Sequence, residues 1–165
     1  MGPIGAAVAI FLALVLVSAA AHKLYARERL VFATSRLLRI NAGLALPAML
    51  GTAALEATSA LALIISQTRG AGALLAILLW GVYFVALTAA ARRGESLLDC
   101  GCSFGTHTQG IDRFALLRPL VLGGLAVAAA AFPKGLDPIA PFAALAFFAA
   151  YLAAGELASA WRTAQ

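Results

Sequence analysis

The chain has 165 residues, of which 63% are hydrophobic and 12% are charged, and its formal net charge is +5. This apolar content excludes a disordered protein, a count of two cysteines excludes a disulfide-stapled secreted domain, and an ordinary soluble globule of 16.9 kDa could not bury so much apolar surface. We therefore expect an all-α polytopic membrane helix bundle, a single integral domain over 1–165, whose Lys and Arg residues belong to its loops and not to a nucleic-acid site.

Five apolar stretches approach the length needed to cross a bilayer, which is about 20 residues per helix. The first lacks the basic start of a signal peptide and is longer than a typical signal-peptide core, so we interpret it as a retained span. We interpret His22 and Lys23, at its end, as an interfacial anchor. The sequence thus predicts four to five transmembrane helices, which cover, in chain order, about 3–21, 43–65, 71–91, 114–132 and 139–160.

The stretch between the first two spans is too polar to cross the hydrocarbon core. On a helix over about 28–40, one arc is mostly apolar and consists of Leu30, Val31, Thr34, Leu37 and Leu38. The opposite arc is charged and consists of Glu28, Arg29, Arg36 and Arg39. This pattern predicts a short helix that lies in the membrane interface. A solvated basic loop is the alternative interpretation.

The most polar stretch of the chain is the loop 92–113, and it contains both cysteines, Cys100 and Cys102, separated only by Gly101. A disulfide between them would close a very small ring, which requires a sharp bend that glycine tolerates. Strained disulfides are typically labile or catalytic, and so short a ring constrains little of the unfolded chain. The pair therefore favours thiol–disulfide exchange, in which one thiolate attacks and the other resolves.

The residues of this loop leave other interpretations open. With His107, the two thiols form a soft ligand set suited to copper(I) or zinc, and Asp99 is adjacent; the protein would then be a soft-metal transporter or metallochaperone. His107 could instead assist proton transfer near the thiols. A third interpretation is a non-catalytic membrane scaffold with inert thiols.

Three charged residues fall within the predicted spans. Glu56 lies at mid-span, where a carboxylate is costly and usually faces the bundle interior, so we expect a proton relay or a structural hydrogen-bond partner. Glu156 lies near the end of its span and can reach the interface. Arg118, in the first turns of the fourth span, is expected to snorkel or to pair with a loop acid.

Basic residues are distributed unevenly between the two sides of such a bundle. Of the 12 Lys and Arg residues, all but Arg69 and Lys134 fall on the side that holds the loop 92–113. The positive-inside rule would place this loop, with its cysteines, in the cytoplasm.

A series of short motifs follows the predicted spans. The first span ends in His22-Lys23-Leu24, the interfacial stretch contains Arg36-Leu37-Leu38, the second span carries Pro47 and Glu56, the third ends in Arg93-Gly94, and the loop contains Asp99-Cys100-Gly101-Cys102-Ser103-Phe104-Gly105. Over roughly Leu12–Leu122, this order resembles the methylamine utilisation protein MauE family, which is related to DoxX-like membrane proteins.

The resemblance implies a role in maturing methylamine dehydrogenase, a periplasmic enzyme whose small subunit holds many disulfides, together with a thioredoxin-fold (MauD-like) partner. The layout is also similar to vitamin K epoxide reductase bundles, which pass electrons to a quinone; with one cysteine pair, this chain would need the shuttle thiols of a partner. The family implies a multi-pass protein of the bacterial inner membrane. It also favours the periplasmic face for the cysteine loop, because disulfides persist there, and we expect this orientation despite the charge count.

Overall fold

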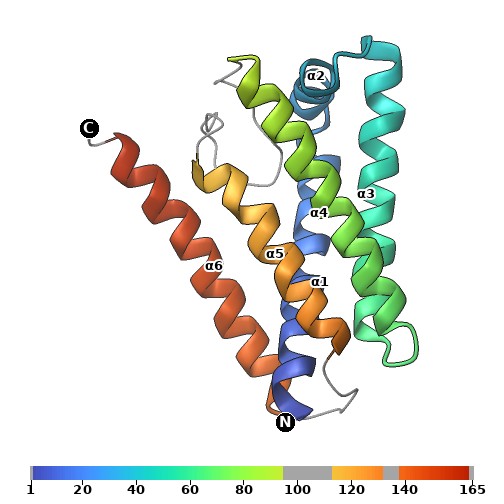
Figure 1. Cartoon of the computed structure of the whole chain (residues 1–165), viewed down its shortest axis with the longest axis vertical. Helices are drawn as coiled ribbons and strands as arrows, with labels where there is room; N and C mark the ends of the chain where they lie inside the picture. Colours follow the sequence, from blue (N-terminus) through green and yellow to red (C-terminus); the bar gives the residue numbers. More distant parts are fainter. Residues whose placement is uncertain (1, 95–112, 132–137, 164–165) are drawn as a thin grey trace.

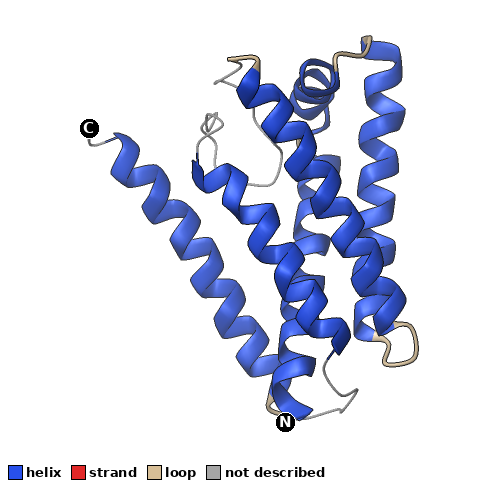
Figure 2. Ribbon diagram, in the orientation of Figure 1, coloured by secondary structure: helices blue, strands red, loops and turns tan. Residues whose placement is uncertain are grey.

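The computed structural model describes residues 2–94, 113–131 and 138–163. This part of the chain forms six helices and no strand, which confirms the predicted all-α class (Figure 2). The helices are α1 (Gly2–Tyr25), α2 (Arg27–Leu38), α3 (Ala42–Ile64), α4 (Arg69–Arg92), α5 (Arg113–Ala131) and α6 (Ala140–Thr163). Four stretches are long and apolar enough to cross a membrane, namely Ile4–Tyr25, Ala42–Ile64, Arg69–Arg92 and Ala140–Leu157, and α5 contributes a shorter apolar helix, Ala115–Ala131.

Helix α1 lies at the centre of the bundle (Figure 1). It packs against α3, α5 and α6, while α4 packs against α3 and α5. The shared core combines large side chains, such as Leu12, Leu16 and Trp80, with fully buried alanines, such as Ala60 and Ala76. Small residues let helix backbones approach closely, which is how helices associate in a membrane, where apolar surface alone gives no preference for protein over lipid.

In the α3–α4 hairpin, the two backbones approach closely at Gly72. A side chain at Gly72 would meet the backbone nitrogen of Leu63 at 2.7 Å and the carbonyl carbon of Ala62 at 2.8 Å. The Ser59 hydroxyl donates a 2.8 Å hydrogen bond to the Gly72 carbonyl oxygen. This close approach sets the register between the two helices and places Glu56 of α3 beside Tyr83 of α4.

The short helix α2 lies across the end of the bundle, against α3 and α4. Its buried side chains are Leu30, which belongs to the predicted apolar arc, and Ala33, which does not, and Leu38 of that arc is exposed. It stops at Leu38 because Arg39 adopts a left-handed conformation with φ of 55°, which ends the helix. The Arg93 guanidinium, at the end of α4, donates to the Leu37 carbonyl oxygen at 3.1 Å and fixes α2 in place.

Candidate functional site

A buried ion pair joins α1 and α3. The Lys23 Nζ lies 2.7 Å from Oε1 and 2.9 Å from Oε2 of Glu56. The Glu56 residue is 1% exposed and Lys23 is 5% exposed. The Tyr83 hydroxyl of α4 donates to Glu56 Oε1 at 2.6 Å, and Lys23 Nζ also lies 5.3 Å from the centroid of the Tyr83 ring.

The ion pair and the hydrogen bond from Tyr83 offset the free-energy cost of burying the Glu56 carboxylate inside an apolar bundle. A buried charge is tolerated when it is paired and its remaining hydrogen-bonding capacity is used. The Glu56 carboxylate accepts hydrogen bonds from the Lys23 ammonium group of α1 and from the Tyr83 phenol group of α4. The predicted structural hydrogen-bond role has this geometry, and the proton-relay role stays a prediction.

The interpretation of Lys23 as an interfacial anchor is wrong. Helix α1 does not end near residue 21 but continues to Tyr25, so Lys23 lies in its last turn with its side chain buried. The reason is the partner: Glu56, 33 residues away along the chain, faces the same interior. A signal existed in the sequence, because a carboxylate at mid-span requires a cation, and Lys23 is the basic residue closest to the apolar part of α1.

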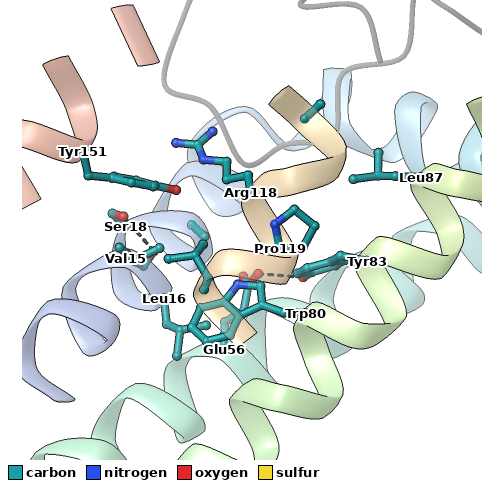
Figure 3. A pocket seen from close by; sticks show the side chains of 13 residues that line it. Val15, Leu16, Ser18, Glu56, Trp80, Tyr83, Leu87, Arg118, Pro119 and Tyr151 are labelled. Atoms are coloured by element: carbon teal, nitrogen blue, oxygen red, sulfur yellow. Dashed lines mark hydrogen bonds between the residues drawn. The ribbon is translucent and has the colours of Figure 1, made fainter. Parts of the chain in front are cut away.

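A pocket opens beside the ion pair and is enclosed by α1, α3, α4, α5 and α6 (Figure 3). Glu56 and Tyr83 lie at its inner end, and Arg118 and Tyr151 lie on the far side in this view. About 30 Å³ of the pocket can hold the centre of a water molecule, compared with the roughly 10–15 Å³ that one water requires. The lining residues are Val15, Leu16, Ser18, Ala19, Glu56, Trp80, Tyr83, Leu87, Ala115, Arg118, Pro119, Leu122 and Tyr151.

Arg118 crosses from α5 to α6 at this pocket. Its guanidinium carbon lies 4.4 Å from the centroid of the Tyr151 ring, a distance at which a cation is attracted to the face of an aromatic ring. Its Nε is buried and has no hydrogen-bond partner among the described residues. The residue is half-buried, and its side chain contributes to the pocket wall, so the structure places it beside the Glu56 cluster.

Four of the remaining predicted site residues lie outside the part of the chain that the structure describes. Cys100, Cys102, Asp99 and His107 fall in 95–112, which lies outside the described residues, as does nearly all of the loop 92–113. The described residues contain no group of three His, Cys, Asp or Glu side chains suited to a metal. This finding does not test Cys100, Cys102 and His107 as alternative metal ligands, because they lie outside those residues. Glu156 lies near the end of α6 and is exposed.

The sequence is similar to one family of known proteins. The model of the methylamine utilisation protein MauE family matches residues 1–133. The methylamine utilization protein MauE of Methylophilus methylotrophus is 30% identical over 137 residues, which cover 82% of this chain and 72% of that protein. No solved structure matches the chain. The matched range contains Lys23, Glu56, Tyr83 and Arg118 as well as both cysteines. The chain therefore belongs to the methylamine utilisation protein MauE family.

Proposed function

We propose that this protein is a membrane accessory factor that exchanges disulfides through Cys100 and Cys102 during the maturation of a periplasmic enzyme such as methylamine dehydrogenase. Membership of the MauE family implies a role in methylamine utilisation. The single observation that carries the chemistry is the Cys100-Gly101-Cys102 triplet, which lies inside the family-matched range and contains the only two cysteines of the chain.

The proposed exchange moves two electrons in each cycle. A thiolate of the client attacks one sulfur of the Cys100–Cys102 disulfide, which breaks that bond and forms a mixed disulfide. The second client thiolate attacks the mixed disulfide, so the client is oxidised and Cys100 and Cys102 are left as a dithiol. A thioredoxin-fold partner in its disulfide form then takes both electrons by the same exchange and restores the pair. Two protons accompany the electrons in each transfer.

In this proposal, the buried cluster around Glu56 receives these protons. The segment with both cysteines joins the end of α4 to the start of α5, and α5 contributes Ala115 and Arg118 to the pocket beside Glu56. A carboxylate next to a phenol and to space for water is a suitable set of groups for accepting and passing a proton. In this proposal, Glu56 and Tyr83 form the relay, and Lys23 holds Glu56 in position.

A quinone is the other oxidant that the family resemblance suggests. The walls contain aromatic rings and the Arg118 donor, but the space inside is about 30 Å³, whereas a cavity that admits a benzene ring is on the order of 150 Å³. A quinone ring does not fit the pocket in this arrangement. In this proposal, the thioredoxin-fold partner oxidises the cysteine pair.

The test is a redox titration of the cysteine pair in the purified protein. Maleimide labelling and intact mass would follow the thiols across dithiol/disulfide buffers. We expect a reversible two-electron transition within the range of exchange enzymes, roughly −120 to −270 mV. Cys100→Ser and Cys102→Ser should each abolish it, whereas Ser103→Ala, beside the pair, should leave it unchanged.

Two results would contradict the proposal. If the thiols never pair within one chain, exchange through this pair does not occur, and titration with copper(I) and zinc would test Cys100, Cys102 and His107 as ligands. If the double Cys→Ser variant still supports formation of active methylamine dehydrogenase in cells, the protein is a scaffold and the thiols are inert.

A further inference from the structure

The charges around the pocket do not balance. Lys23 and Glu56 neutralise each other as an ion pair, and Glu56 is the only carboxylate among the described residues that line the pocket. Arg118 is therefore left as a positive charge whose described interaction is the ring of Tyr151, and its buried Nε lacks an acceptor within the described part of the chain. A half-buried guanidinium in this state favours an anionic oxygen as its partner.

Arg118 lies where α5 faces α6. Helices α5 and α6 both pack against α1, and the seam between α5 and α6 has fewer close backbone contacts than either of these interfaces. The Arg118–Tyr151 contact bridges this seam. Both helices carry exposed apolar side chains, among them Leu117 of α5 and Leu145 of α6.

The depth of Arg118 also fits a lipid head group. It lies five residues after Arg113, the first residue of α5, which corresponds to about 7.5 Å along the helix axis. A long arginine side chain at this depth can reach the phosphate level of a bilayer. The small volume inside the pocket is no obstacle, because only a phosphate oxygen needs to approach the guanidinium, while the acyl chains stay in the bilayer.

We propose that Arg118 and the α5–α6 seam form a binding site for one anionic phospholipid. A phosphate oxygen accepts hydrogen bonds from the Arg118 guanidinium, Tyr151 holds the guanidinium across the seam, and the acyl chains lie along the apolar surfaces of α5 and α6. Because the positive charge is not balanced by the described lining residues, the site prefers a head group with a net negative charge over a zwitterionic one. This site does not depend on the proposed disulfide exchange.

The test uses the delipidated full-length protein in a neutral detergent, titrated with phosphatidylglycerol or phosphatidylcholine. Native mass spectrometry counts retained lipids, and thermal unfolding gives an apparent Kd. We expect one phosphatidylglycerol to be retained and to raise the Tm. Arg118→Gln should weaken its apparent Kd by roughly 10- to 100-fold, since hydrogen bonds to charged groups are of that strength. Arg118→Lys should keep part of the preference for phosphatidylglycerol.

Arg36→Gln is the matched control, because Arg36 is also an arginine over an aromatic ring, that of Phe32, but it is exposed on α2 and away from the pocket. It should leave the apparent Kd unchanged. The proposal fails if both lipids bind equally, or if Arg36→Gln weakens binding as much as Arg118→Gln. It also fails if Arg118→Gln lowers the Tm without lipid while lipid adds nothing to the wild-type protein, since Arg118 would then pair with an acid of this chain. If Arg118→Gln is unfolded, the Arg118→Lys titration alone decides between these outcomes.

Discussion

Lys23 and Glu56 are each tolerated in the bundle interior only because the other is present. Lys23→Met leaves the Glu56 carboxylate buried with Tyr83 as its remaining donor. We expect a loss of about 3–5 kcal/mol in the free energy of unfolding, because removing one partner of a buried ion pair leaves an uncompensated charge. Thermal or denaturant unfolding in detergent measures this loss. Arg27→Met, at an exposed basic position on α2, should cost far less.

The double variant Lys23→Met with Glu56→Leu separates structure from chemistry at the same site. It removes both charges, and replacing a buried pair by apolar side chains of similar size is often close to neutral for stability. We expect most of the lost stability to return and proton-coupled turnover of the cysteine pair to stay impaired. A double variant with wild-type stability and wild-type turnover would show that Glu56 is a structural residue only.

Among the helices, the α3–α4 hairpin depends most on a single small residue. Gly72→Ala places a methyl group within 2.7 Å of backbone that cannot yield without separating α3 from α4, and it disturbs the hydrogen bond from Ser59. We expect a loss of about 1–3 kcal/mol, typical of overpacking, measured by thermal unfolding. Gly81→Ala is the matched control in the same helix: nothing lies within 4 Å of its added methyl, so the better helix propensity of alanine should make it neutral or slightly stabilising.

The helices themselves were largely predictable, because length, apolar runs and polar breaks are local properties of the sequence. The mid-span position of Glu56 was equally visible. Its partners were not, since Lys23 and Tyr83 lie 33 and 27 residues away and meet Glu56 only through the packing of α1, α3 and α4. The predicted end of α2 was two residues too late, because Arg39 adopts a left-handed conformation that ends the helix. Such a conformation is typical of glycine, so an arginine gives no sign of it in the sequence.

At the scale of the whole molecule, the structure assigns the charges to two ends of the bundle. Arg93, at the end of α4, contacts Leu37 of α2, so α2 and this end of α4 lie at the same end of the bundle. The α3–α4 turn lies at the other end (Figure 1). Lys23 at the first end is neutralised by Glu56, and Arg69 near the second is buried. Because both side chains are buried, neither Lys23 nor Arg69 is a reliable signal of membrane orientation. When both are left out of the count of Lys and Arg residues, the α2 end still has the excess of basic residues.

The orientation of the α2 end decides which compartment the cysteines can serve. For the proposed maturation of a periplasmic client, this end must face the periplasm, against the charge bias. In a protein with Cys100→Ser and Cys102→Ser, we would introduce Tyr25→Cys or Gln67→Cys; Tyr25 is 94% exposed at the α2 end, and Gln67 is exposed in the α3–α4 turn. A membrane-impermeant maleimide should label the first variant in intact cells, and the second only after permeabilisation. The reverse pattern would place the thiols in the reducing cytoplasm, where direct oxidation of a periplasmic client through them is impossible.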